Sequence, residues 1–247
     1  MNFLLEYLLG GHYYKLNEMS GISEKEHPRW AEKWNAGIAP GETFDMACPL
    51  PALVKMVDEN QIPYGRALVP GCGRGYDVTL LAAPNRTAIG LDISEVAIAA
   101  ATERYNSLPD EERPPPESAV FISTSFFDLP EDDNSKFDFV YDYTFLSALD
   151  PSIRPDWAAK MAAIVKAGGE LCTIIFPIGD RPGGPPFQVT IDDYKNLLEP
   201  VGFTPFQLEM LPPELCHRGR AGDYHEATIK RFGVPVSTAI GRWRKNE

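Results

Sequence analysis

The sequence has little positive charge and few cysteines, and each shortage argues against a class of function. Its 247 residues include 23 Lys and Arg against 35 Asp and Glu, a formal net charge of -12. Because such a surface repels polyanions, we expect no nucleic-acid partner. The cysteines form no CxxC pair, so neither a zinc site nor a disulfide framework is indicated, and their scatter favours a reducing, cytoplasmic setting. They are Cys48, Cys72, Cys172 and Cys216.

The chain also lacks an apolar run of the ~20 residues that a membrane span needs. The N-terminal MNFLLEYLLG is apolar, but it contains Glu6 and has no basic start. We interpret it as a docked helix or a frayed end rather than as a signal or an anchor. With 44% apolar and 23% charged residues, the composition is that of a globular protein. At this length we expect a single domain, residues 1–247, whose oligomeric state the sequence leaves open.

Short β-rich runs alternate with helical segments from residue 66 onward. The runs are RALVP, TAIGLDI, AVFIST, FDFVYDY and GELCTIIFPI, and their alternation with helices predicts βαβ units in a mainly parallel sheet. Ser94 is a predicted N-cap for the helix that begins EVAIAAATERY. A second helix, within residues 150–169, is expected to end at the pair Gly168 and Gly169.

The stretch ALVPGCGRGYD places Gly71, Gly73 and Gly75 directly after an apolar run. A strand, a glycine loop and a helix in this order are typical of a site where a ligand packs against backbone. The third glycine comes one residue too early for the dinucleotide fingerprint G-x-G-x-x-G. Asp92 ends the next predicted strand, 21 residues after Gly71, and its carboxylate can accept hydrogen bonds from both hydroxyls of a ribose. The sequence therefore predicts a ligand that contains a ribose.

The GCGRG loop and its distance from Asp92 resemble motif I of the class I S-adenosylmethionine-dependent methyltransferases. The resemblance implies an α/β fold with a Rossmann-like, doubly wound, seven-stranded and mainly parallel sheet. Helices would cover both faces, and FTPFQLEML and STAIGRWRK would form the reversed C-terminal β-hairpin of that class. The implied cofactor is S-adenosyl-L-methionine, with S-adenosyl-L-homocysteine as its product.

The chain is also similar to the thiopurine and thiol methyltransferase family, above all to its plant and fungal thiol and halide branch. The similarity covers about residues 28 to 243 through RWAEKWNAG, LVPGCGRGYDVTLLA, GLDISEVAI, FDFVYDYTFLSALDPSIRPDWAAKM, GGELCTIIFPI, GGPPF and GRW. It implies a lid, residues 1–45, over a core of residues 46–247. Trp30 and Trp34, which share one helix face, would belong to the lid. An aromatic face suits a sulfonium cation, although two tryptophans can also simply pack into a core.

The same resemblance assigns roles to the cofactor residues. Gly71 would contact the amino-acid part of the cofactor, and Asp92 would bind the ribose. Ser125 stands where the family has an acid near the adenine, and Phe44 and Asp45 stand where it has a Trp-Asp pair, so these matches are partial. The implied cofactor residues are Trp30, Trp34, Gly71, Cys72, Gly73, Asp92, Ile93, Ser125, Phe126 and Tyr143.

Asp142 and Tyr143 end the fourth predicted strand, at the crevice where cofactor and acceptor would meet. We predict them as catalytic residues, although either can also be a structural polar group. Arg154 resembles an arginine on the substrate side of the family. If the reaction needs a base, it would come from Asp142, Tyr143, His217 or His225.

No Ser-His-Asp or Cys-His arrangement is recognisable, and no metal site is predicted. A thiol acceptor suits such a site, because a thiol with a pKa of about 8.5 is already a few per cent thiolate near pH 7. We therefore expect a cytoplasmic S-adenosylmethionine-dependent S-methyltransferase for small thiols, hydrosulfide or halide ions. The alternatives are an O- or N-methyltransferase of a small secondary metabolite, which would need a stronger base, a nicotinamide-dependent oxidoreductase, and a non-catalytic adenosyl-binding module.

Overall fold

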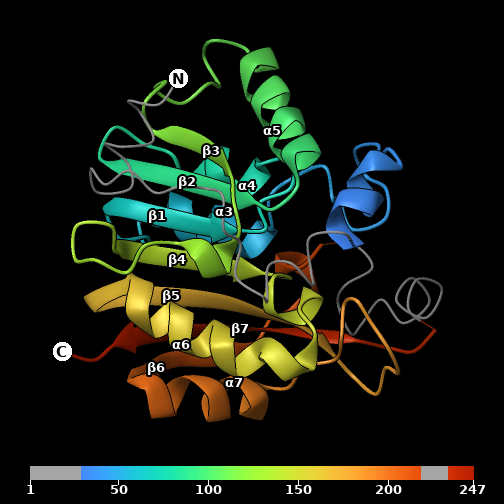
Figure 1. The fold of residues 1–247 in the computed structure, drawn as a ribbon, viewed down its shortest axis with the longest axis vertical. Helices are drawn as coiled ribbons and strands as arrows, with labels where there is room; N and C mark the ends of the chain where they lie inside the picture. Colours follow the sequence, from blue (N-terminus) through green and yellow to red (C-terminus); the bar gives the residue numbers. More distant parts are fainter. Residues whose placement is uncertain (1–28, 218–232) are drawn as a thin grey trace.

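A single seven-stranded sheet crosses the molecule in the order β3-β2-β1-β4-β5-β7-β6 (Figure 1). The computed structural model describes residues 29–217 and 233–247, so the N-terminal MNFLLEYLLG lies outside the described residues. The strands are β1 (Gly65–Pro70), β2 (Arg86–Asp92), β3 (Ala119–Ser123), β4 (Phe137–Tyr143), β5 (Val165–Ile178), β6 (Phe203–Met210) and β7 (Ser237–Lys245).

The direction of the strands confirms the predicted fold class. Strands β1 to β5 pair in parallel with their neighbours, whereas β7 runs antiparallel to both β5 and β6. The reversed strand therefore belongs to a C-terminal β6–β7 pair, as expected. The segments FDFVYDY and STAIGRWRK coincide with β4 and β7 from end to end.

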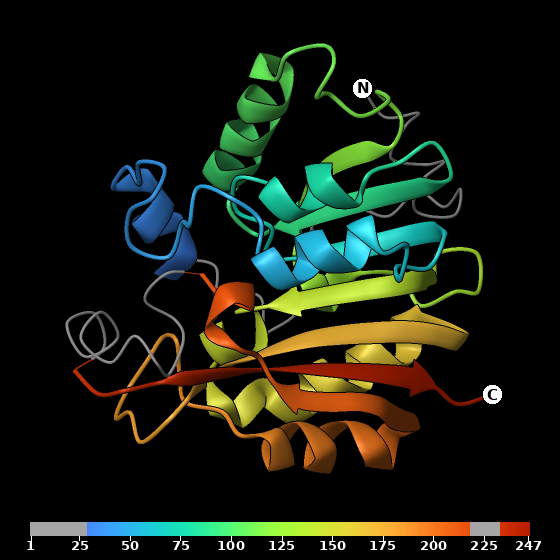
Figure 2. The same cartoon turned by 180° about the vertical axis from the view of Figure 1, so that it is seen from behind.

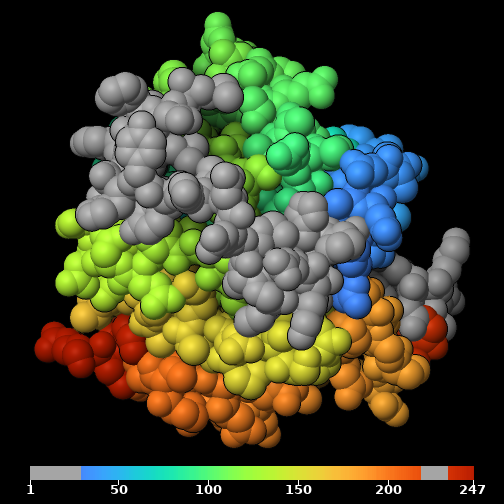
Figure 3. All heavy atoms as spheres, viewed as in Figure 1, coloured from blue at the N-terminus to red at the C-terminus, as the bar shows by residue number. Residues whose placement is uncertain are grey.

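Helices cover both faces of the sheet. Figure 2 shows α3 and α4 in front of it, while α6 and α7 cover the face that is seen in Figure 1. In Figure 3 the yellow and orange atoms of α6 and α7 lie next to each other in the lower part of this face. Among the residues that the structure describes, no helix has the length and apolarity needed to cross a membrane. The α-helices that follow residue 50 in the described part of the chain are α3 (Pro51–Asp58), α4 (Tyr76–Leu81), α5 (Glu95–Ser107), α6 (Arg154–Ile164) and α7 (Ile191–Leu198).

The alternation of side chains along each strand divides the core into two halves. On β1, Leu68 packs into the cluster with α6 and α7, whereas Ala67 and Val69 pack into the cluster with α3 and α4. Successive side chains of a strand point to opposite faces, and both faces are covered, so the central strands bury apolar side chains on both faces. This double burial fixes the register of the strands and with it the positions of their carboxyl ends.

Helix α6 ends earlier than the sequence predicted. It stops at Ile164, and the extended residue Val165 begins β5. Gly168 has a positive φ of 71°, but it lies inside β5, where the pairing with β4 shifts register. A glycine with a positive φ can occupy an irregular position in a strand as well as the end of a helix. The prediction that the glycine pair ends the helix was therefore wrong, because both glycines lie in β5.

The N-cap of α5 agrees with the prediction. Ser94 is almost completely buried, and its hydroxyl accepts a hydrogen bond from the Ala97 backbone N–H at 3.3 Å. The cap fixes the start of α5 directly after the carboxyl end of β2.

Replacing this cap tests how firmly that start is held. We expect Ser94→Ala to lower the free energy of unfolding by about 1 kcal/mol, because the Ala97 N–H loses its partner. The matched control is Ser107→Ala at the exposed other end of α5, where the change should stay below about 0.5 kcal/mol. Equal losses for both variants in denaturant unfolding would contradict the capping role.

Candidate active site

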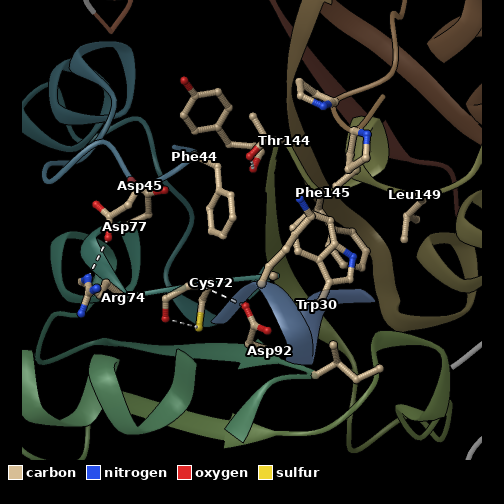
Figure 4. A pocket seen from close by; sticks show the side chains of 18 of the residues that line it. Trp30, Phe44, Asp45, Cys72, Arg74, Asp77, Asp92, Thr144, Phe145 and Leu149 are labelled. Carbon is tan, nitrogen blue, oxygen red and sulfur yellow. Dashed lines mark hydrogen bonds and ion pairs between the residues drawn. The ribbon is translucent and has the colours of Figure 1, made fainter. Parts of the chain in front are cut away.

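A cavity of about 460 Å³ lies at the carboxyl ends of β1 to β4. Its walls come from the segment that contains helical residues 29–35, from the glycine loop, and from the residues after each of these strands (Figure 4). The structure brings all the predicted cofactor residues into this lining, which includes Trp30, Trp34, Gly71, Cys72, Gly73, Asp92, Ile93, Ser125, Phe126 and Tyr143.

The glycines after β1 adopt backbone conformations that other residues avoid. Gly71, Gly73 and Gly75 have φ of 63°, 51° and 71°, in the left-handed region where a Cβ is strained. Space is short as well, since a Cβ on Gly71 would lie 2.7 Å from Cδ2 of Phe145 and one on Gly75 would lie 2.4 Å from Cε1 of Phe121. The loop therefore presents bare backbone to the cavity.

Asp92 joins this loop to the end of β2. One carboxylate oxygen accepts the Gly73 backbone N–H at 3.1 Å, and the other accepts the Ser94 N–H at 3.0 Å. Burial raises the pKa of Asp92 to about 6, although these bonds and one from the Ile93 N–H oppose the shift. The side chain lines the cavity, so Asp92 holds the loop in place and also presents a carboxylate to a ligand.

An aromatic cluster forms the wall opposite the sheet. Phe44 lies between the two tryptophans, with ring centroids 5.7 Å from Trp30 and 5.7 Å from Trp34 in edge-on contacts. Trp34 is buried, whereas Trp30 remains partly exposed. Phe44 is thus the apolar group that covers the face shared by the tryptophans, and all three side chains line the cavity.

Arg74 anchors this wall to the glycine loop. Its Nε donates to Asp45 at 2.7 Å, its Nη2 donates to the carbonyl of Ile38, and its guanidinium lies 5.6 Å from the ring centroid of Trp34. The Asp45 and Arg74 side chains are only 3% and 16% exposed. An ion pair so shielded from water keeps more of its attraction than a surface pair does. Figure 4 shows both side chains at one edge of the pocket.

The end of β3 contributes a third part of the lining. Ser125 caps the short turn Phe126–Asp128, because its hydroxyl accepts the Phe127 N–H at 3.2 Å. Phe126 packs edge-on against Phe145 with a centroid distance of 5.1 Å. These residues lie beside Asp92, where the adenine of a bound nucleoside is expected.

Tyr143 and His217 form a stacked pair at the other side of the cavity. Their ring planes are within 4° of parallel, and the centroids are 5.6 Å apart. His217 is only 4% exposed, yet it lines the cavity together with Tyr143. His12, His27, His225 and the rest of the 218–232 segment lie outside the described residues.

Asp142, predicted to reach the crevice beside Tyr143, does not line the cavity. It is completely buried, and its carboxylate accepts the Trp157 indole N–H at 2.9 Å and the Leu146 backbone N–H at 3.2 Å. Burial raises the pKa of Asp142 to about 6, although these bonds and one from Phe145 oppose the shift. Neighbouring residues on a strand face opposite sides, so only Tyr143 of the pair reaches the cavity.

Arg154 also lies outside this cavity. Its guanidinium donates to the Gln188 carbonyl at 3.2 Å and lines an adjacent hollow of about 470 Å³. Arg181 borders both spaces and donates to the carbonyl of Pro186. The structure therefore separates Arg154 from the other predicted site residues.

The lining residues that the sequence reasoning missed include the ionisable side chains of Asp77 and Arg181. Burial raises the pKa of Asp77 to about 7, against the effects of the Leu50 N–H and the Arg104 charge. The signals were present, because Asp77 follows the third glycine at the start of α4 and Arg181 precedes the GGPPF segment. Within residues 29–217 and 233–247, no three His, Cys, Asp or Glu side chains are grouped as a metal centre requires.

Solved structures share this fold at low sequence identity. A Burkholderia thailandensis 1,6-didemethyltoxoflavin-N1-methyltransferase, solved with 1,6-didemethyltoxoflavin and S-adenosylhomocysteine, superposes with a TM-score of 0.63 at 16% identity. The match covers 93% of this chain and 92% of that one. A structure from work on converting a disulfide bond into a thioacetal group during echinomycin biosynthesis gives a TM-score of 0.61 at 19% identity, covering 91% and 93% of the two chains.

Several curated proteins have a higher sequence identity to this chain than these solved structures do. An Arabidopsis thaliana protein named "Probable thiol methyltransferase 2" is 37% identical over 225 residues, covering 91% of this chain and 88% of that protein. Thiocyanate methyltransferase 1 of Brassica oleracea is 38% identical over 220 residues, covering 89% and 86%. The family described as thiopurine S-methyltransferase matches residues 25–210, a span that holds the aromatic wall, the glycine loop and the ends of β1 to β5. The chain belongs to the thiopurine S-methyltransferase family.

Proposed function

We propose that this protein transfers the methyl group of S-adenosylmethionine to a small thiol, or to a small polarizable anion such as hydrosulfide, thiocyanate or a halide. One observation carries the proposal: a single cavity spans the reversal of strand order between β1 and β4. Ligands of open α/β sheets bind at such a switch point. The glycine loop and Asp92 lie on one side of it, and Tyr143 lies on the other. The names of the plant relatives support the acceptor class.

The residues beside β1, β2 and β3 suit the cofactor. The two carboxylate oxygens of Asp92 offer about four acceptor sites, more than the three backbone N–H groups of Gly73, Ile93 and Ser94 use, so ribose hydroxyls can bind there. Gly71 and its neighbours in the loop leave backbone exposed for the amino-acid part. Ile93 and Phe126 supply apolar surface for the adenine.

When bound, the cofactor supplies a methyl group that its sulfonium activates. The chain's own task is to hold the acceptor in line with that methyl group and to exclude water. Holding two reactants in a reactive geometry can contribute about 7 to 11 kcal/mol. The rings of Trp30 and Phe44 can stabilise the sulfonium charge by cation–π attraction, and the Arg74–Asp45 ion pair keeps that wall against the loop.

We infer a positioning role for Asp142 instead of the catalytic role expected from its place in the sequence. Its hydrogen bonds to Leu146 and Trp157 tie the turn after β4 to α6. That turn carries Tyr143 and Phe145 into the cavity. Asp142 therefore acts through the residues that it holds.

We further infer that residues 1–247 form one methyltransferase domain, with residues 1–45 as its lid and 46–247 as its core. The ion pair between Asp45 and Arg74 connects the two parts. A reducing, cytoplasmic setting is consistent with the four cysteines, all of which are free thiols.

The acceptor class is tested by a methyl-transfer assay over alkanethiols, hydrosulfide, thiocyanate, iodide and phenols, with S-adenosylhomocysteine formation as the readout. We expect turnover of thiols and of at least one small anion, with phenols at background. Turnover of phenols alone would replace the proposal with an O-methyltransferase. A panel without any turnover would refute methyl transfer to these acceptors.

Cofactor affinity should depend on pH through Asp92. The ionised carboxylate accepts both ribose hydroxyls, so binding requires a proton to leave a group with a pKa of about 6. At pH 5 only about a tenth of Asp92 is ionised, and calorimetry should give a dissociation constant for S-adenosylhomocysteine about tenfold higher than at pH 8.

The variants for this experiment are Asp92→Asn and Asp128→Asn. Asp92→Asn should bind more weakly at both pH values and lose most of the tenfold difference. Asp128→Asn, an exposed site in the turn after β3 that lies outside the cavity, should keep the affinity and the pH dependence of the original protein. An unchanged slope in Asp92→Asn would show that another group controls binding.

Replacing Asp142 separates positioning from proton transfer. In Asp142→Asn the amide NH₂ faces an N–H donor, so we expect the free energy of unfolding to fall by about 2 kcal/mol. Trp157→Phe removes the indole donor from the same interaction, and a loss of about 1 to 3 kcal/mol should follow. An Asp142→Asn protein of full stability that has lost only turnover would instead identify Asp142 as the base.

A further inference from the structure

The acceptor end of the cavity can be located from the strand order. The cofactor end lies over β1, β2 and β3, so the remaining lining, beyond the reversal of strand order, belongs to the acceptor. It comes from the ends of β4 and β5, from the loop after β5, and from the residues after β6. This lining includes Tyr143, Phe176, Arg181, Pro185, Pro186 and His217.

His217 is held in a defined orientation at this end. Its ring stacks on Tyr143 with the planes within 4° of parallel, and the preceding Cys216 is buried in the core cluster below. Only 4% of His217 is exposed, and the exposed part contributes to the cavity lining. A neutral imidazole has one ring nitrogen that accepts a proton.

The carboxylates in and near the cavity are poorly placed to accept a proton from the methyl acceptor. Asp142 lies outside the lining, with its oxygens bonded to Leu146 and Trp157. Asp92 lies at the cofactor end and holds the glycine loop, and Asp45 is paired with Arg74. Asp77 lies in the first turn of α4, directly after the glycine loop and so at the cofactor end, and its carboxylate accepts the Leu50 N–H. A thiol at the acceptor end would therefore meet an imidazole before it met any of these carboxylates.

We propose that His217 is the catalytic base for acceptors that carry a proton, an inference that rests on the proposed function. The S–H proton passes to the neutral imidazole, and the electron pair left on sulfur forms the new S–CH₃ bond. The bond from the methyl carbon to the sulfonium breaks, and its electron pair stays on the sulfur of S-adenosylhomocysteine. The imidazolium then releases its proton to water. Thiocyanate and iodide carry no proton near pH 7 and react without His217.

The expected loss of kcat/KM without His217 follows from the fraction of the acceptor that is already ionised. A thiol with a pKa of about 8.5 is about 3% thiolate at pH 7, so a base can raise its reactive fraction by at most about 30-fold. Loss of the base should therefore lower kcat/KM for a cysteine-type thiol of this pKa by about 10- to 30-fold at pH 7. For an anion that is already ionised, kcat/KM should change by less than about threefold.

The experiment compares His217→Gln with the original protein on a cysteine-type thiol with a pKa of about 8.5 and on thiocyanate, each with S-adenosylmethionine. The expected result is a loss of about 10- to 30-fold on the thiol and almost none on thiocyanate. Glu214→Gln, at an exposed position just before the site, is the matched control and should leave both acceptors unaffected. Calorimetric binding of S-adenosylhomocysteine establishes that each variant has folded.

A second variant tests the same point by chemical rescue. In His217→Ala, added imidazole should restore turnover of the thiol and leave turnover of thiocyanate unchanged, which a merely structural role for His217 would not produce. Equal losses on both acceptors, or no loss on the thiol, would overturn the proposal. If the unaltered protein methylates neither acceptor, the proposed function itself fails, and the role of His217 fails with it.

Discussion

The hydrogen bond from the Gly73 backbone N–H to the Asp92 carboxylate, 3.1 Å long, joins the two strand ends on which the site depends. It fixes the glycine loop after β1 to the end of β2, and the second oxygen of Asp92 holds the start of α5 through Ser94. Arg74, in the same loop, extends the connection to the aromatic wall through Asp45. One buried carboxylate thus holds the loop and a helix terminus in place through hydrogen bonds. Through the loop it also supports the wall over the cavity.

Two acids with similar pKa values carry out different tasks because of their surroundings. Burial raises the pKa of both Asp92 and Asp142 to about 6, but Asp92 lines the cavity whereas Asp142 is sealed beneath it. The first can therefore bind a ligand, while the second stabilises the turn that carries Tyr143. Neither carboxylate is therefore placed to deprotonate the acceptor, and that task falls to His217 when the acceptor carries a proton.

The sheet was predictable because its apolar runs are bounded by turns and charged residues, so that β4 was located to the residue. The position of β7 came from the family resemblance. The glycine loop and Asp92 were found because their spacing reflects local backbone geometry. The end of α6 was missed, since a glycine pair serves a bulged strand as well as a helix terminus. Because side chains alternate between the two faces of β4, the sequence could have shown that Tyr143 and Asp142 do not both face the cavity. The stacking of His217 on Tyr143 is a long-range contact, which no periodicity of the sequence encodes.

The most direct test of the account is a crystal structure of the complex with S-adenosylhomocysteine. The account predicts that the ribose hydroxyls lie within hydrogen-bond distance of Asp92, with the amino-acid part along the glycine loop. It also predicts that the thioether sulfur faces Tyr143 and His217. A ligand whose ribose lies away from Asp92, or whose sulfur points away from the Tyr143 and His217 pair, would contradict the division of the cavity into a cofactor end and an acceptor end.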